Sequence, residues 1–275
     1  MAGVRAAARV AQQVLRDGGG CEDAAVGAVR VLEEDPAFNA GRGSCMTAAG
    51  TFEHDAGLMR SRDLRSGAVA AVPDVRDAIL LARLVLERTE HCLVVGPGAV
   101  ALGQEFGVGT FGRDAVWCEK AQARFDAVRA GALHAEGRAD TVGAVVLDGH
   151  GELCAAVSTG GVLLKRPGRV GDSPLVGSGF YAHPRLGAAV TTGKGEAILT
   201  HLMAYEALQR IARGEDPQSS SEAFCRDVAA AEKATCGLIL ITPDGRTAVT
   251  HASQHMSWAL ARGQGEPTAG LARPR

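Results

Sequence analysis

Residues 137–161 read GRADTVGAVVLDGHGELCAAVSTGG, and this stretch decides how the second half of the chain folds. A polar segment ends at Asp140, and two apolar runs, TVGAVVLD and ELCAAVSTGG, follow on either side of Gly-His-Gly. Two apolar runs around a short glycine-containing segment are typical of a β-hairpin. We therefore expect an antiparallel strand pair that opens at Thr141.

The two threonines that bound this hairpin are predicted to face each other. A turn centred on His150 places Thr141 opposite Thr159, and another loop length would shift the pairing by about one residue. Opposed residues share a sheet face, with Cβ atoms roughly 5 Å apart. Cross-strand threonine pairs are common in sheets, so taken alone an ordinary structural pair is the simpler interpretation.

Composition excludes several classes of protein. The chain has 275 residues, 46% apolar and 22% charged, and a formal net charge of -2, values typical of a globular protein with a substantial core. The small negative charge and 4% aromatic residues argue against a nucleic-acid surface. No run approaches the roughly 20 apolar residues that span a bilayer. We expect no nucleic-acid or membrane partner.

The seven cysteines are odd in number and never spaced as Cys-x-x-Cys, a pattern of reduced thiols in a cytoplasmic protein. Neither the cysteines nor the histidines form a catalytic or metal-binding pattern. The alanine- and arginine-rich start carries Asp17 and ends at a glycine cluster, so we interpret it as a helix and not as a transit peptide.

Periodicity predicts a layered α/β domain whose sheets are covered on both faces. Helices are expected at 3–17, 21–35, 74–89, 98–107 and 195–214, and strands at 50–59, 66–72, 91–96, 188–192 and 237–253, the last a hairpin. Residues 119–140 mix charge and alanine, and we interpret them as a mobile linker with some helix. The tail after residue 253 is expected to be disordered.

A linker that ends just before a strand-opening threonine favours a second interpretation of the pair. A threonine made N-terminal by cleavage carries its own base, because an α-amine has a pKa of about 7.7–8.0. In the intact chain that nitrogen is an amide and cannot accept a proton. Cleavage between Asp140 and Thr141 would therefore activate Thr141 as a nucleophile.

The motifs around this pair resemble the plant-type L-asparaginases and isoaspartyl peptidases, which are N-terminal nucleophile hydrolases. The resemblance runs from Ala2 to Trp258 through LEEDPAFNAGRGS, FEHDAGLM, GAVAAV, DTVGAVVLD, GHGELCAAVSTGG, PGRVGDSPLVGSGFYA and TTGKGE, in order. It implies a four-layer αββα sandwich, formed as one 1–275 precursor domain that cuts itself into parts 1–140 and 141–275. It also implies hydrolysis of L-asparagine, β-aspartyl peptides or both, and a homodimer of the precursor or of the two-part unit.

Arg169 and Asp172, three residues apart in GRVGDSP, are predicted to face one small ligand. A guanidinium binds a carboxylate through two bonds, and a carboxylate accepts from an ammonium, so together they suit the zwitterionic end of an amino acid. Without the resemblance, an Arg–Asp surface ion pair is the favoured interpretation. In the resembling family the matching positions bind the substrate's α-carboxylate and α-amine.

Thr192 and Gly193 in TTGKGE precede an expected helix, where a backbone N–H and a hydroxyl can stabilise an oxyanion. The resemblance implies this role for both. A phosphate-binding P-loop is excluded, because Lys194 is followed by Gly195 and not by Ser or Thr. The GxGxxG match at Gly107 follows a helical pattern and not a strand, so we attribute it to chance.

Asn39 is by default a turn residue before a small side chain, and the resemblance places it at the oxyanion side of the catalytic centre. The resemblance also implies a structural sodium on the same loop and no other required cofactor. The sodium ligands would be the backbone carbonyls of Leu32, Glu33, Asp35, Phe38, Ala40 and Arg42. Backbone ligation leaves no side-chain pattern to read.

The chain departs from the family in two places, which leaves alternatives open. Asp140 stands where asparaginases often have glycine, and an Asp-Thr pair is found in glycosylasparaginases and in taspase, although Asp172 argues against the latter. The family also has a first strand ending in His-Gly-Gly before the first helix, which this chain lacks. We therefore expect self-cleavage to be inefficient in this form. An uncleaved, inactive homologue with a structural or binding role is the alternative function.

Overall fold

The computed structural model describes residues 1–132 and 141–272, so Asp140, the linker beyond residue 132 and residues 273–275 lie outside the described part. Its helices are α1 (Ala2–Arg16), α2 (Cys21–Glu34), α3 (Ala78–Arg88), α4 (Gly96–Phe106), α5 (Arg113–Val116), α6 (Glu119–Arg129), α7 (Gly195–Thr200), α8 (Met203–Ala212) and α9 (Pro217–Glu232), with a 3-10 turn, η1, at Gly41–Gly43. Its strands are β1 (Glu53–Arg60), β2 (Ser66–Pro73), β3 (Leu93–Val95), β4 (Val142–Leu147), β5 (Leu153–Thr159), β6 (Phe180–His183), β7 (Gly187–Gly193), β8 (Cys236–Ile241), β9 (Thr247–His251), β10 (Met256–Leu260) and β11 (Thr268–Ala272).

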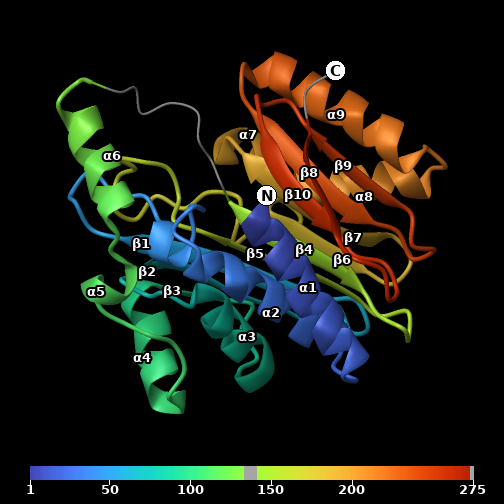
Figure 1. The fold of residues 1–275 in the computed structure, drawn as a ribbon, viewed down its shortest axis with the longest axis horizontal. Coiled ribbons are helices and arrows are strands. Elements are labelled where there is room, and N and C mark those ends of the chain that lie inside the picture. The colour runs from blue at the N-terminus through green and yellow to red at the C-terminus, as the bar shows by residue number, and fades with distance from the viewer. Residues whose placement is uncertain (133–140, 273–275) are drawn as a thin grey trace.

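The described strands form two larger sheets and one hairpin (Figure 1). The five-stranded sheet has the order β3-β2-β1-β5-β4, the four-stranded sheet has the order β6-β7-β8-β9, and β10 pairs with β11. Neighbouring strands run antiparallel except β2 and β3, which are parallel. The chain is thus a mixed α/β protein, as the periodicity predicts.

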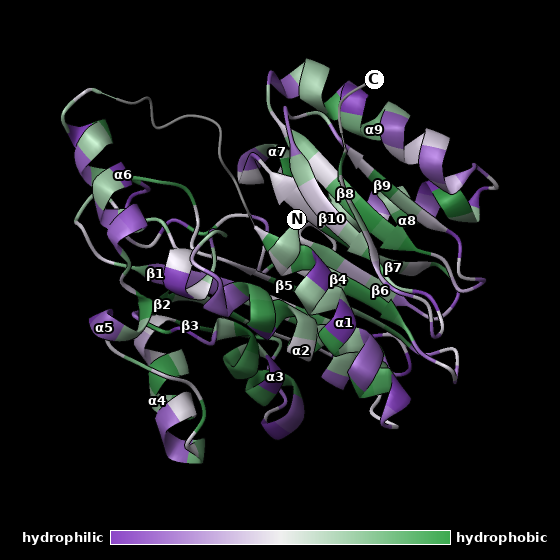
Figure 2. Cartoon of the chain, in the orientation of Figure 1, coloured by the Kyte–Doolittle hydropathy of each residue, from purple (hydrophilic) through white to green (hydrophobic). Residues whose placement is uncertain are grey.

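Apolar side chains of both sheets meet in a shared core. Val157 of β5 and Phe180 of β6 belong to one buried cluster, and the absence of a side chain at Gly57 lets the Phe180 ring lie against β1. A second cluster joins α1–α3 to the five-stranded sheet, and a third joins α8 and α9 to the four-stranded sheet. Figure 2 shows hydrophobic residues along β8 and alternating hydrophilic and hydrophobic residues along α1 and α9.

The central hairpin has the predicted register. Val142 pairs with Ser158, so the next position outward places Thr141 opposite Thr159. The turn is fixed locally, because the Asp148 carboxylate accepts from the backbone N–H groups of His150 and Glu152 at 2.9 and 3.0 Å. A side chain that closes its own turn fixes the loop length, and the loop length fixes the register.

The single long helix predicted at 195–214 is wrong, because α7 and α8 are separate helices. Leu202 between them has a left-handed backbone with φ of 45°. The first amides of α8 donate to another loop, Ala204 to Ser178 O and Tyr205 to Gly177 O, and not to the preceding turn of helix. These tertiary hydrogen bonds replace the helical ones and break the helix at Leu202.

Helix α9 was not predicted, although its start carries a readable signal. Asp216 accepts from the backbone N–H of Ser219 at 3.0 Å, and Pro217 occupies the first helical position. An aspartate cap followed by proline is a typical helix beginning.

The disordered tail predicted after residue 253 is also wrong for residues up to 272, because β10 and β11 form a hairpin. Gly270 gives the Trp258 ring room to lie on β11, since a Cβ there would be 2.7 Å from the ring. Helix α1 holds the hairpin loop, where the Gln12 amide donates to Gly263 O and Gly265 O at 2.7 and 2.8 Å. The sequence pattern missed this order because it depends on a helix 250 residues away.

Candidate active site

The two threonine hydroxyls at the open end of the hairpin are in contact. Thr141 Oγ1 donates to Thr159 Oγ1 at 3.2 Å, and the backbone N–H of Gly161 donates to the same oxygen at 3.1 Å. Thr159 is buried and Thr141 is half-buried. The hydroxyl of Thr159 is therefore fixed by the backbone and in turn orients the side chain of Thr141.

A carboxylate extends this row onto a third strand. Asp55 of β1 pairs with Thr159 of β5, so Asp55, Thr159 and Thr141 share one sheet face. Asp55 Oδ1 accepts from the backbone N–H of Ala71 at 2.7 Å, whereas the buried Oδ2 has no hydrogen-bond partner. Burial raises the pKa of Asp55, and the positive charge of Lys165 opposes that rise. Asp55 was missed from the sequence, where it stands among other polar residues directly before the apolar run Ala-Gly-Leu-Met.

Asn39 contacts the two glycines that follow Thr159. Its buried side-chain amide donates to Gly161 O at 2.5 Å, and its Oδ1 accepts from the backbone N–H of Cys45 at 2.8 Å. Its backbone carbonyl accepts from Gly160 at 2.9 Å. Asn39 therefore fixes the two glycines that follow Thr159.

Thr192 and Gly193 end strand β7 close to the nucleophile candidate. Thr141 and Thr192 both line one cavity of about 70 Å³, together with Phe38 and Met256. Gly193 has φ of 137°, and a Cβ there would lie 2.2 Å from Thr235 O, so only glycine fits. The helix that follows is α7 with six residues, shorter than predicted.

The predicted pair Arg169 and Asp172 converges on one small space. A Cβ on Gly195 would lie 2.7 Å from Arg169 Nη2 and 2.9 Å from Asp172 Oδ1. Glycine at this position therefore lets a guanidinium nitrogen and a carboxylate oxygen approach the same point of the backbone. The arrangement suits one ligand with a carboxylate and an ammonium on the same carbon.

Two further residues, neither of them predicted, hold this pair. Arg169 Nε and Nη2 both donate to Glu196 Oε1, at 3.1 and 2.9 Å. Thr191 Oγ1 donates to Asp172 Oδ2 at 3.2 Å. Burial raises the pKa of Asp172 to about 6, although the Thr191 hydroxyl and the Arg169 charge both lower it.

A second buried acid lies on the opposite face of β5. Glu33 Oε1 accepts from Ser158 Oγ at 2.6 Å and from the backbone N–H of Ile79 at 3.1 Å, while Oε2 has no hydrogen-bond partner. Burial raises the pKa of Glu33 to about 8. This carboxyl is therefore neutral at pH 7. Sequence reasoning considered only its backbone carbonyl.

The predicted sodium loop runs from the end of α2 through η1, and its glycines bring carbonyls close. A Cβ on Gly41 would lie 2.3 Å from Glu33 O, and one on Gly43 would overlap Phe38 O. Asp35 O and Ala40 O each also accept one backbone N–H. Carbonyl oxygens are the ligands that a hard cation prefers. Within the described residues, no group of His, Cys, Asp or Glu side chains is arranged to hold a metal.

Two other structural findings bear on the class of protein. None of the helices in the described residues is both long enough and apolar enough to cross a membrane. No disulfide bond links cysteines within residues 1–132 and 141–272.

Comparison with known proteins places the chain in a family. A family model described as asparaginase matches residues 1–271. The isoaspartyl peptidase/L-asparaginase of Bos taurus is 39% identical over 94% of this chain and 86% of its own length. The human protein of the same name is 38% identical with the same coverage, and the plant-type L-asparaginase of Pyrococcus abyssi is 39% identical over 98% and 92%. The chain belongs to the asparaginase family that this model describes.

Proposed function

We propose that this chain is an autoprocessing threonine amidohydrolase that releases aspartate from L-asparagine, β-aspartyl peptides or both. Its relatives carry the names isoaspartyl peptidase/L-asparaginase and plant-type L-asparaginase. The observation that carries the proposal is the 3.2 Å contact between the Thr141 and Thr159 hydroxyls at the residue that follows the linker.

Cleavage between Asp140 and Thr141 would convert the amide nitrogen of Thr141 into an α-amine. That amine takes the proton of Oγ, and Oγ attacks the side-chain amide carbon of the substrate. The carbon–nitrogen bond then breaks, the proton passes to the leaving ammonia or amine, and an aspartyl ester of Thr141 remains. Water attacks this ester in the same way and releases aspartate.

The remaining site residues orient the nucleophile or stabilise the oxyanion. Thr159 orients the nucleophile through its hydroxyl contact. Thr192, Gly193 and Asn39 stand at the side where the oxyanion develops, and preorganised donors there are worth about 3–4 kcal/mol each. Asn39 acts from its position beside Gly160 and Gly161, which it fixes.

Arg169 and Asp172 bind the α-carboxylate and the α-ammonium of the aspartyl group. Glu196 accepts from Nε and Nη2 of Arg169, so the substrate carboxylate would bind the other edge of the guanidinium, Nη1–Nη2, which lies between Gly171 and Gly195. The Asp172 carboxylate faces the same space and accepts from the ammonium. A zwitterion satisfies both groups at once, which a neutral ligand does not.

We also propose the four-layer αββα sandwich for the whole chain, with 1–140 and 141–275 as its two parts after cleavage. Buried clusters between the sheets and on the outer face of each sheet support it. The assembly would be a homodimer of this unit.

A sodium ion would be held by the backbone carbonyls of the loop that follows α2 and would only stabilise that loop. A rise in Tm with sodium chloride, but not with choline chloride, would support the sodium site.

The test measures ammonia from L-asparagine and free leucine from β-aspartyl-leucine with the purified protein and its Thr141→Ala variant. The parent is expected to hydrolyse at least one substrate, and the variant neither. Hydrolysis by Thr141→Ala at the parent's rate would contradict the proposal. A folded parent that stays uncut and inactive would favour the structural or binding alternative.

A further inference from the structure

A buried ammonium lies under the loop that carries Arg169. The side chain of Lys165 has no exposed surface, and its Nζ lies 3.4 Å from Glu53 Oε2. The same Nζ donates to the backbone carbonyl of Arg169 at 3.2 Å. A charge that leaves water costs several kcal/mol unless it gains partners, so these two contacts explain why the chain tolerates a lysine there.

The acid of this pair binds the same loop from the other side. Both carboxylate oxygens of Glu53 accept from the backbone N–H of Gly168, at 3.1 and 2.9 Å. The ion pair therefore binds Gly168 N through its acid and Arg169 O through its base. Gly168 has φ of 82°, a conformation that favours glycine, and the backbone around Arg169 is held at two atoms, Gly168 N and Arg169 O.

Lys165 also lies next to the threonine row. Its stem packs on Gly161, where a Cβ would be 2.8 Å from Lys165 Cδ, and Gly161 donates to Thr159. Its charge attracts the buried carboxylate of Asp55, which is paired with Thr159 across the sheet. One ammonium thus links the strand that carries Thr159 to the loop that carries Arg169.

We propose that Lys165 and Glu53 are positioning residues for substrate binding, which hold the Arg169 backbone so that its guanidinium faces the space over Gly195. The inference rests on the role proposed above for Arg169. A buried ion pair adds little net stability over apolar residues of the same volume, so stability alone does not account for it. A displacement of about 1 Å in a binding group, in contrast, costs about 100-fold in rate.

The test measures kcat and KM for L-asparagine in Lys165→Met, normalised to the fraction of protein that has been cleaved. We expect KM to rise about tenfold and kcat to change less than threefold, because the clamp binds the part of the substrate that does not react. Glu53→Gln keeps an oxygen that accepts from Gly168, so we expect a smaller rise in KM. It also serves if Lys165→Met fails to fold.

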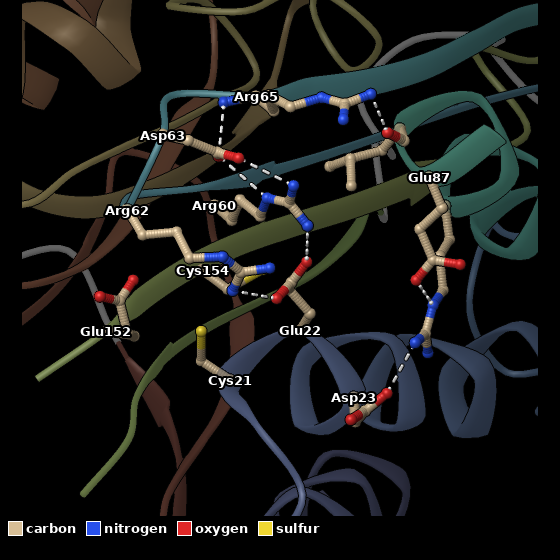
Figure 3. Close-up of polar contacts among 12 residues, drawn as sticks. Cys21, Glu22, Asp23, Arg60, Arg62, Asp63, Arg65, Glu87, Glu152 and Cys154 are labelled. Atoms are coloured by element: carbon tan, nitrogen blue, oxygen red, sulfur yellow. Dashed lines mark hydrogen bonds and ion pairs between the residues drawn. The ribbon is translucent and has the colours of Figure 1, made fainter. Parts of the chain in front are cut away.

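The matched control is Glu22→Gln, which removes a partly buried ion pair with Arg60 at the other end of β1 (Figure 3). It is expected to lower Tm and leave KM unchanged. In an Arg169→Lys background, Lys165→Met should raise KM no further, because a residue that acts through Arg169 has nothing left to position.

Two results overturn the inference. One is a KM within twofold of the parent in both Lys165→Met and Glu53→Gln while Arg169→Lys is impaired. The other is an equal rise in KM in the Arg169→Lys background, which would show a role independent of Arg169. If Arg169→Lys itself binds asparagine normally, the proposed substrate site fails, and this inference fails with it.

Discussion

The charged groups at the two ends of strands β1 and β5 are in opposite states. At the end shown in Figure 3, the Arg60 guanidinium binds both oxygens of Asp63 and one oxygen of Glu22, and Arg62 binds the other oxygen of Glu22. Hydrogen bonds from Arg60 lower the pKa of Asp63 to about 2. At the threonine end, the pKa values of Asp55 and Asp172 are raised, and Asp55 Oδ2 has no hydrogen-bond partner.

The difference separates charge that holds the fold from charge that is available to a ligand. Carboxylates with guanidinium partners ionise more easily, whereas desolvated ones resist ionisation until a cation arrives. An α-ammonium group is such a cation, and it would pair with the ionised carboxylate of Asp172. Perturbed acids that cluster beside a nucleophile candidate mark a functional site by a physical criterion.

The largest expected effect is at the nucleophile. Thr141→Ala removes the attacking oxygen and should lower the rate of asparagine hydrolysis by about 10⁴-fold or more. The matched hydroxyl at the other end of β5 is Ser61, which accepts from Leu153 at 2.9 Å. Ser61→Ala should cost about 1 kcal/mol of stability and leave the rate unchanged. Comparable rates of asparagine hydrolysis in Thr141→Ala and Ser61→Ala would contradict a catalytic role that is specific to the threonine end of β5.

Exchange of arginine for lysine tests the same comparison next. Arg169→Lys keeps the charge but loses the planar two-bond grip, so kcat/KM for asparagine should fall by the equivalent of about 2–4 kcal/mol. Arg60→Lys loses its two-bond contact with Asp63 and should lower Tm without a change in KM. Turnover by Arg169→Lys within a few-fold of the parent would contradict the carboxylate-binding role.

Glu33→Gln should stabilise the protein at neutral pH, in contrast to Glu22→Gln, which removes the acid of Arg62 and one of the two acids of Arg60. The folded pKa of Glu33, about 8, is raised above its ordinary value of 4.5, so its contribution to stability is full below that ordinary value and is lost progressively as pH rises from there to 8. Glutamine does not titrate, so the gain should be about 3 kcal/mol at pH 7 and vanish near pH 4. Urea unfolding at several pH values measures it, and a gain independent of pH would contradict the assignment.

The smallest expected effect is a second acid limb in the pH profile of kcat/KM, at lower pH than the limb set by the α-amine of Thr141. Substrate binding needs the ionised form of Asp172, whose pKa is raised to about 6. Below pH 6, kcat/KM should therefore fall by an additional tenfold per pH unit, or about 1.4 kcal/mol. The raised pKa means that protonation of Asp172 favours folding, so unfolding does not explain this limb. Asp172→Asn should lack it, and a limb that persists in this variant would assign it to another group.

Local chemistry made part of this molecule predictable. The hairpin register follows from the turn at Asp148, and both of its contacts lie within four residues. Arg169 and Asp172 are three residues apart in a glycine-containing loop, so the sequence spacing was enough to predict that their side chains lie close together. The break at Leu202 was not, because it depends on carbonyls of Gly177 and Ser178.

The supporting residues were missed for the same reason. Asp55 faces Thr159, which lies 104 positions later, and Glu53 binds Gly168 at a separation of 115. Only tertiary packing brings such groups together, and no spacing rule encodes it.

The central claim is that Thr141 acts through a free α-amine, and N-terminal sequencing of the purified protein tests it most directly. Fragments are separated under denaturing conditions, and activity is measured against the fraction cut. The account predicts that the smaller fragment begins Thr-Val-Gly-Ala and that activity rises in proportion to that fraction, however small it is. Activity in wholly intact chain, or in protein cut at another bond, would contradict it.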